Sequence, residues 1–278
     1  EKPEIIHCHD IIPLHICAQS AKKVRSKLIY DSHELHPSTE EPKITRKIYR
    51  FLEHKYIKKS NLVITANEAR RKVMLKHYKK MKNKSVAIHN YPEQEKTKVQ
   101  EKKNKKVIFI YQGVISDNRG IQNIIIAASK LKKKEFEIIM YGTANNKEKY
   151  LKQIQKLNLE NNISLHEPID IQKLFKIMEK CDVGFNSVAN TSLNNFYCAP
   201  NKLYDYLKSG LAVIGPSFPH IKKEIEENNM GQVCDFDNVD SVKEAMEWFL
   251  DRKKELHKIK KRAVKKHQEI FNWEKEAE

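Results

Sequence analysis

Short apolar runs alternate with segments of helical periodicity along almost the whole chain. Runs such as EIIHCH (4–9), KLIYD (27–31) and KVIFIYQG (106–113) have the pattern of short buried strands. In residues 42–59, apolar side chains recur every three or four positions, which predicts a helix. The same criteria predict further strands at 61–65, 85–90, 135–141, 162–166, 182–186, 212–214 and 231–235, and helices at 11–24, 67–78, 119–132, 146–158, 170–179, 201–209, 219–228, 239–250 and within 252–278.

Strands and helices that alternate in this way form parallel sheets covered by helices. Residues 93–105 are polar, charged and aperiodic, which is typical of a linker. The pattern therefore predicts an α/β protein with two Rossmann-like domains that face each other across a cleft. We expect about four strands in the first domain and six or seven in the second. Because the chain opens directly on a core strand, we expect the first domain to be incomplete at its start.

Composition narrows the class of protein. The chain has 278 residues, a net charge of +17 and 40% apolar residues, so a substantial core is expected and disorder is not. No apolar run approaches the roughly 18 residues of a membrane span, and no secretory signal is visible. The five cysteines lack CxxC spacing and are odd in number, which indicates reduced, half-buried thiols in a cytoplasmic protein.

The basic residues are concentrated in residues 70–84, which hold eight lysines and arginines and no acidic residue. Such a run is compatible with a solvated helix face, or with a surface for anionic lipid, a phosphorylated substrate or nucleic acid. Tyr78 is the one aromatic residue within it, so a base-stacking surface is disfavoured and nucleic acid is an unexpected partner.

Ligands of parallel sheets bind at the carboxyl ends of the strands. All seven glycines follow residue 112, so a phosphate site built from backbone N–H groups is expected in the second domain only. His7 and His9 share one strand end without an evident carboxylate partner, and no metal cluster is predicted. In the first domain, the strand-end rule selects His7, His9, Asp10, Asp31, His33, Glu34, Asn67 and Asn90. Among them, His9, Asp10, His33, Glu34, Asn67 and Asn90 are the cleft or acceptor candidates.

Two stretches of the second domain have the features of an anion site. In YQGVISDNRGIQN (111–123), a strand ends at Gly113 and Arg119-Gly120 open a helix, whose N–H groups and dipole attract anions. In YCAPNKLYDYLKSGLAVIGPS (197–217), a helix begins after Pro200 with Asn201 and Lys202 and ends before Gly210. Its Asp205 is suited to accept ribose or sugar hydroxyls. Taken singly, each stretch is equally compatible with an ordinary turn or a capped helix.

Together, and in this order, the two stretches resemble the family 4 retaining glycosyltransferases of the GT-B fold. PEIIHCHD, KLIYDSHE, SNLVITAN, VAIHNYP and FNWEKEAE resemble further segments of that family, so the resemblance covers nearly the whole chain. It implies an acceptor domain at 1–95, a linker at 96–105, a nucleotide-sugar-binding domain at 106–260, and a C-terminal helix at 261–278 that crosses back to the first domain.

The resemblance also implies roles for single residues. Gly113, Arg119, Gly120, Asn201 and Lys202 match the segments that contact the donor diphosphate and sugar, and Asp205 matches the acid that holds ribose. His9 matches the histidine beside the transferred sugar and is the implied catalytic residue. The family's basic residue after the strand glycine is replaced by Val114, and its first glutamate by Tyr197.

The implied activity is metal-independent transfer of a sugar from a UDP- or GDP-type donor to a glycan or lipid-linked acceptor, without a cofactor. Surface polysaccharide or glycolipid synthesis at the inner, anionic face of a bacterial membrane is the implied setting. The alternatives are a nucleotide-sugar epimerase of the same architecture and a non-catalytic basic binding protein. An epimerase would need acid and base groups on both sides of the cleft, in which the second domain is poor.

Overall fold

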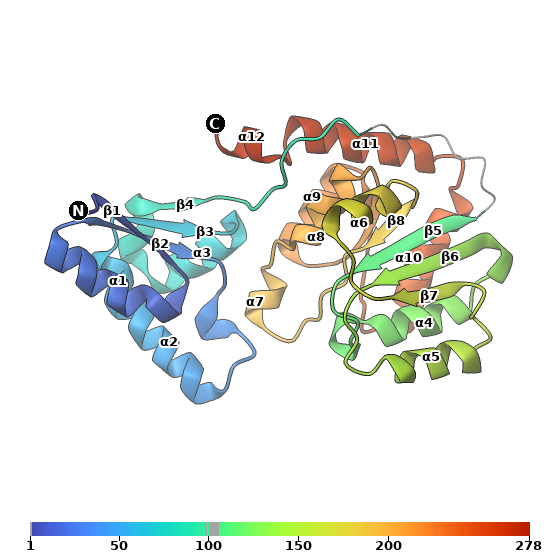
Figure 1. Ribbon diagram of the computed structural model, residues 1–278, viewed down its shortest axis with the longest axis horizontal. Helices are drawn as coiled ribbons and strands as arrows, with labels where there is room; N and C mark the ends of the chain where they lie inside the picture. The colour runs from blue at the N-terminus through green and yellow to red at the C-terminus, as the bar shows by residue number, and fades with distance from the viewer. Residues whose placement is uncertain (1, 98, 100–105) are drawn as a thin grey trace. The chain divides into compact units, whose positions relative to one another are not determined.

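The computed structural model describes residues 2–97, 99 and 106–278 and divides into two compact units (Figure 1). The first unit contains the chain up to Asn90 and a returning segment, Asn190–Ala199. The second contains Tyr91–Ala189 and Pro200–Glu278, and so includes the C-terminal helix expected to cross back to the first domain. Most of the expected linker, 96–105, lies outside the described residues.

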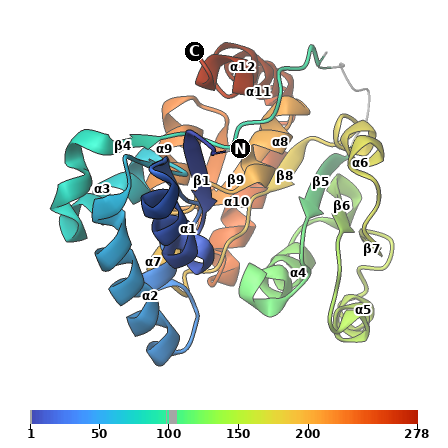
Figure 2. The same cartoon turned by 60° about the vertical axis from the view of Figure 1, so that its left-hand side comes forward.

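The first unit is built on a four-stranded parallel sheet of order β1-β2-β3-β4. Burial alternates along its strands, so that Cys8, Leu28, Tyr30 and Val63 share one face and pack against the helices as a single core. Helices α1 and α2 lie side by side (Figure 2). The elements are β1 (Ile5–His9), α1 (Ile11–Val24), β2 (Lys27–Ser32), η1 (His36–Ser38), α2 (Lys43–Tyr56), η2 (Ile57–Lys59), β3 (Leu62–Thr65), α3 (Glu68–His77), η3 (Lys79–Lys84), β4 (Ser85–Ala87) and α7 (Leu193–Phe196).

The second unit has a six-stranded parallel sheet of order β10-β9-β8-β5-β6-β7. Its central strands β8 and β9 are buried along their whole length, as expected for a sheet covered on both faces. The elements are β5 (Val107–Gln112), η4 (Asp117–Arg119), α4 (Ile121–Ser129), η5 (Lys133–Glu135), β6 (Phe136–Tyr141), α5 (Lys147–Lys156), β7 (Ile163–His166), α6 (Ile171–Met178), β8 (Val183–Phe185), α8 (Asn201–Lys208), β9 (Ala212–Pro216), α9 (Pro219–Glu227), β10 (Gly231–Cys234), α10 (Val239–Asp251), α11 (Leu256–Glu269) and α12 (Trp273–Glu276).

The strand order of the second sheet reverses between β5 and β8. From β5 the chain proceeds outward through β6 and β7, and from β8 it proceeds in the opposite direction through β9 and β10. Connections that depart in opposite directions leave a crevice at the carboxyl ends of the two strands, which is where open α/β sheets bind ligands. Gly113 follows β5 at this point, and Asn186 follows β8. The fold therefore places the predicted anion site at the topological switch point.

Two expectations about side chains need correction. The basic run 70–84 is not a uniformly solvated face, because Arg70 is buried and Lys84 Nζ donates to the carbonyls of Ile57 and Lys58 at 3.1 Å. The cysteines are free, as expected, but four of the five are buried rather than half-buried, with Cys17 the intermediate one.

Candidate functional site

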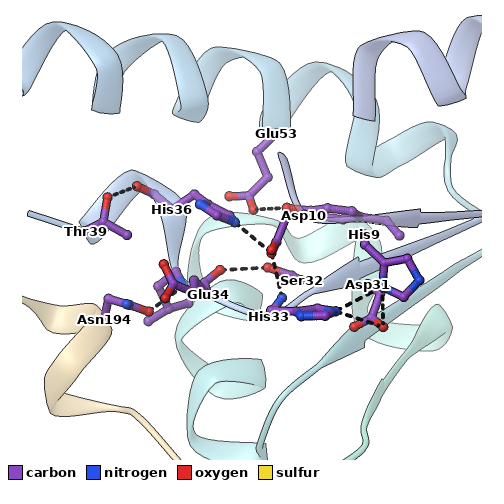
Figure 3. A network of polar contacts seen from close by, with 12 residues as sticks. His9, Asp10, Asp31, Ser32, His33, Glu34, His36, Thr39, Glu53 and Asn194 are labelled. Atoms are coloured by element: carbon purple, nitrogen blue, oxygen red, sulfur yellow. Dashed lines mark hydrogen bonds and ion pairs between the residues drawn. The ribbon is translucent and has the colours of Figure 1, made fainter. Parts of the chain in front are cut away.

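The first candidate site lies at the carboxyl ends of β1 and β2 in the first unit (Figure 3). The two strands are parallel, and His9 is the register partner of Asp31. The carboxyl ends therefore bring His9, Asp10, Asp31 and His33 together, as the strand-end rule predicts. The strand-end rule selects Asp31 as well, although it was not named among the cleft or acceptor candidates, and its position one strand away from His9 follows from the parallel register.

Asp10 has a strained backbone. Its φ of 63° and ψ of 179° fall in a region that is almost restricted to glycine and costs about 1–3 kcal/mol. The strain is sustained by its contacts: Asp10 N donates to Asp31 O at 2.8 Å, while Oδ1 accepts from His33 N at 2.9 Å and contacts His36 Nε2 at 2.8 Å. Strained residues held by several bonds are concentrated at functional sites. Asp10 is therefore a positioning residue for this site.

The charge of Asp10 is set by the same contacts. Burial opposes ionisation of the carboxyl group, but the hydrogen bonds and electrostatic interactions with His36 and His33 together outweigh this effect, and the pKa of Asp10 is lowered. Asp10 thus stays ionised and anchors the loop that carries His33 and His36 (Figure 3).

Three histidines surround the carboxylate of Asp31. Its Oδ2 lies 3.3 Å from His7 Nε2, 3.5 Å from His9 Nδ1 and 3.3 Å from His33 Nε2. The expectation that His7 and His9 lack a carboxylate partner is wrong, because the partner comes from the neighbouring strand rather than from nearby sequence. His9 makes these contacts through Nδ1 and not through Nε2.

Asn67, Glu34 and Asn90 have different surroundings. Asn67 is fully buried and is the N-cap residue of α3: Oδ1 accepts from Arg70 N at 2.7 Å and Nδ2 donates to Tyr197 O at 2.9 Å. Its amide therefore serves the fold. Glu34 is exposed, and its backbone carbonyl accepts a hydrogen bond from Ser32 Oγ. Asn90 is exposed too and follows β4, the edge strand of the sheet opposite β1.

The returning segment 190–199 is fixed to the first unit by buried bonds. Arg70 Nη2 donates to Asn194 O at 3.1 Å and to Asn194 Oδ1 at 2.9 Å, and that same oxygen accepts from Leu35 N at 2.8 Å. Burial lowers the pKa of Arg70. Tyr197 packs against the core of the first unit, so the structure places it with that unit, whereas Asp205 belongs to the second.

The second candidate site lies at the carboxyl end of β5 in the second unit. Gly113 has φ +123°, and Gly120 has φ +67° with no room for a side chain, since a Cβ there would lie 2.9 Å from Phe236 Cβ. A Cβ on Gly142 would lie 1.7 Å from Gly113 O. Glycines are therefore required where these loops pack closely together, and Gly113 is the exposed one of the three.

Two cationic side chains approach Tyr111, the penultimate residue of β5. Lys202 Nζ lies 4.6 Å from the centre of the Tyr111 ring and donates to Ser187 O at 3.2 Å. Burial raises the pKa of Tyr111, and the positive charge of Arg119 opposes that rise, which places Arg119 within electrostatic reach of the same ring. Lys202 and Gly113 thus lie against Tyr111, which was not among the predicted site residues, and the charge of Arg119 acts on the same side chain.

Asp205 lies one turn into α8, facing the end of β5. Its Oδ2 accepts a hydrogen bond from Gln112 Nε2 at 3.0 Å. Burial raises the pKa of Asp205, although Gln112 and Lys208 favour the ionised form. Asn201 begins α8 directly after its N-cap residue, Pro200.

Two polar residues, Asn186 and Ser187, follow β8 at the edge of the sheet where the strand-end rule predicts ligands. Asn186 and Ser187 are fully buried, and neither the amide of Asn186 nor the hydroxyl of Ser187 has a hydrogen-bond partner among the described residues. Buried polar groups without partners are rare and indicate a bound water or ligand group. Since both residues lie at the switch point, they add hydrogen-bonding capacity to the site around Tyr111.

Known proteins resemble the chain in sequence pattern and in fold. A family model for glycosyl transferases group 1 matches residues 92–266, and no match was found among curated proteins. In the part of the chain that the structure describes, no helix combines the length and apolarity needed to cross a membrane.

Solved structures cover nearly the whole chain. The chain is similar to sucrose-phosphate synthase from Thermosynechococcus elongatus, with 13% identity and a TM-score of 0.75 over 99% of this chain and 71% of that one. It is similar to Anabaena HepE in complex with UDP, with 16% identity and a TM-score of 0.74 over 97% and 75%. It is also similar to the pneumococcal O-GlcNAc transferase GtfA in complex with UDP and GlcNAc, with 17% identity and a TM-score of 0.73 over 98% and 54%. At these identities, the comparison supports the predicted GT-B fold.

Proposed function

The chain belongs to the glycosyl transferases group 1 family, and from this premise we propose that it transfers a sugar from a UDP-sugar to a hydroxyl of a glycan or lipid-linked acceptor. The observation that carries the proposal is the position of Lys202 and Gly113 against Tyr111 at the switch point of the second sheet, with the positive charge of Arg119 acting on the same side chain. HepE and GtfA, which share the fold, are described in complex with UDP.

In the proposed donor complex, the diphosphate lies beside Arg119 and Lys202 and the N-terminus of α8. Departure of the sugar leaves negative charge on the diphosphate, and two fixed cations and a helix N-terminus stabilise that charge. These groups supply the charge that a metal ion provides in other transferases, so we propose that donor binding needs no metal. Asp205 accepts hydroxyl hydrogen bonds from the ribose, while Asn186 and Ser187 offer buried hydrogen-bonding groups nearby.

His9 is the proposed catalytic residue on the first unit. Its Nδ1 contacts Asp31 and His33, which orients the ring and directs Nε2 to the substrate. In this position, the imidazole contacts the transferred sugar and the acceptor hydroxyl. We further propose retention of the anomeric configuration, on the basis of the family resemblance described above.

The proposed acceptor setting is the anionic cytoplasmic face of a membrane that carries lipid-linked glycans. Helix α2 supports it: Ile44, Ile48 and Phe51 form an exposed stripe, at 73%, 53% and 64% exposure, at helical spacing. Lysines and arginines flank this stripe, and the one acidic residue of α2, Glu53, is buried. Exposed apolar side chains with basic neighbours are typical of helices that lie in an anionic membrane interface.

The transferase proposal is tested by incubating the protein with a panel of UDP-sugars and diphosphate-lipid-linked glycan acceptors, with and without EDTA. We expect acceptor-dependent release of UDP and a glycan one sugar longer, at a rate that EDTA leaves unchanged. Hydrogen exchange at C2 of the sugar without acceptor would instead indicate epimerisation. The absence of UDP binding or turnover with every donor would contradict the proposal.

The membrane proposal has a separate test. The protein should co-sediment with vesicles that contain anionic lipid. The Phe51→Ser and Ile48→Ser substitutions should each reduce the fraction of protein bound to the vesicles severalfold. Leu151→Ser, which changes an exposed apolar residue of the second unit, serves as the matched control. Equal binding by all three variants, or binding to neutral vesicles alone, would contradict a role for α2.

A further inference from the structure

Four side chains with metal-ligating atoms converge on the more exposed face of the first sheet. His7 and His9 are two residues apart on β1 and therefore point to the same face. Asp31 is the register partner of His9 on β2, and His33 follows one residue beyond that strand. The imidazoles are 42%, 59% and 51% exposed for His7, His9 and His33, so an ion from solvent can reach them.

Three of the donor atoms have the separations of ligands around one small ion. His9 Nδ1, His33 Nε2 and Asp31 Oδ2 form a triangle with sides of 3.1, 3.3 and 3.5 Å. Its centre lies about 1.9 Å from each atom, so an ion slightly above the plane has the bond lengths of about 2.0–2.1 Å that zinc makes with nitrogen and oxygen. His7 Nε2 lies 3.3 Å from the same Asp31 oxygen, and His7, His9 and Asp31 offer ligand atoms within 4.8 Å of one another.

Hydrogen bonding alone satisfies this cluster poorly. A nitrogen of a neutral imidazole is either a donor or an acceptor. If both His9 Nδ1 and His33 Nε2 donate to Asp31, the two N–H groups face each other at 3.1 Å as donors. If one of them is the acceptor of the pair, it loses its bond to Asp31. A cation at the centre receives lone pairs from all three atoms at once.

We propose that His7, His9, Asp31 and His33 form a binding site for Zn²⁺. Three imidazoles and one carboxylate are a donor set that suits zinc, whereas Mg²⁺ and Ca²⁺ prefer oxygen ligands. Asp31 Oδ2, His9 Nδ1 and His33 Nε2 are the three ligands of the triangle, and His7, whose Nε2 lies 3.3 Å from the same Asp31 oxygen, is the fourth ligand. The bound ion places positive charge on the imidazole of His9.

The effect on sugar transfer rests on the proposed function. A transferred sugar develops positive charge at its anomeric carbon, and a zinc ion held by the neighbouring His9 disfavours that charge. Zinc at site-saturating concentration is therefore expected to slow transfer in the wild-type protein and to have less effect in His7→Gln. If zinc binds at these residues and transfer is unaffected, the placement of His9 at the sugar is wrong, while the metal site stands.

The site itself is tested by binding, without any activity measurement. Calorimetric titration of the metal-free protein with ZnCl₂ should give one site per chain, and CoCl₂ should give the intense visible absorption of a tetrahedral Co²⁺ complex. His7→Gln and Asp31→Asn should each weaken zinc binding about tenfold or more, because each removes one ligand. His166→Gln, which removes an exposed histidine of the second unit, should leave the affinity unchanged.

The variants His7→Gln and Asp31→Asn are both needed to separate loss of a ligand from loss of stability. Asp31→Asn also removes the partner of three histidines, whereas His7 is exposed and its replacement leaves the core intact. Loss of affinity in His7→Gln with an unchanged melting temperature supports the site. Zinc binding that persists undiminished in His7→Gln and Asp31→Asn, or the absence of any one-to-one binding by the wild-type protein, would overturn it.

Discussion

The two units present their sheet edges with opposite chemistry. The edge of the first unit is made of titratable side chains, His9, Asp10 and Asp31 among them, on a segment without a single glycine. The edge of the second is made of glycine turns, helix N-termini and the cations Arg119 and Lys202. Both edges are formed by the carboxyl ends of parallel strands, so the difference in their chemistry comes from the residues at the edge and not from the arrangement of the strands.

This difference indicates a division of labour. A diphosphate is recognised well by backbone N–H groups and fixed positive charge, which require close backbone approach and therefore glycine. Proton transfer and contact with hydroxyl groups require titratable side chains, which are found at the edge of the first unit. Substitutions in the two units should therefore affect different kinetic quantities.

The largest effect is expected from His9. His9→Ala removes the proposed contact with the reacting sugar and should lower the turnover rate by about 10²–10⁴-fold, while the affinity for UDP changes less than about twofold. Steady-state kinetics and UDP calorimetry on the same preparation measure the two quantities. His7→Gln, in the absence of zinc, is the matched control. A parallel loss of UDP affinity in His9→Ala would show that the division between the units is wrong.

The next effect concerns the cations of the second unit. Arg119→Ala or Lys202→Ala removes one charge-assisted contact with the diphosphate and should weaken UDP binding by about 10–100-fold. Calorimetry compares each variant with Lys243→Ala, which breaks an exposed ion pair with Glu247 and should leave UDP affinity intact. Zinc affinity should be unchanged in all three. If Lys243→Ala weakens UDP binding as much as the other two, general charge rather than local placement is responsible.

A smaller effect is expected from Asp205, and it depends on pH. Burial raises its pKa, so the carboxylate that accepts ribose hydroxyls is lost as pH falls through this raised value, and is fully present above it. UDP affinity should therefore decline on acidification at a higher pH than an exposed carboxylate would cause. Asp205→Asn should bind UDP a few times more weakly at pH 8 and lack this acidic decline. An unchanged pH profile in Asp205→Asn would exclude Asp205 as the titrating group.

The alternation of strands and helices, the Asn67 cap and the glycine stop after α8 could be predicted from the sequence, because each depends on local periodicity or on one residue's backbone preference. The contacts of Asp31 could not, since they arise from the register of two strands that are separated by a helix. The short helix α7 and the buried role of Arg70 were also missed, because both depend on a segment more than a hundred residues away.

The second candidate site could likewise be predicted only as far as local sequence patterns determine it. Gly113, Arg119, Lys202 and Asp205 were predicted from turn and helix-start signals, and the structure gathers them at one edge. Tyr111, around which the cations lie, reads in the sequence as an ordinary strand residue. Asn186 and Ser187 are distinguished only by burial without a partner, which no sequence pattern reveals. Tyr197 was grouped with Asp205 by resemblance, whereas the structure assigns the two residues to different units.

Amide hydrogen exchange in the presence of saturating UDP tests the central claim most directly, because it reports which edge holds the nucleotide. The account predicts slowed exchange in 112–121 and 200–206, and unchanged exchange in 5–10 and 31–36. Protection confined to the first unit, or no protection in either unit at saturating UDP, would contradict it.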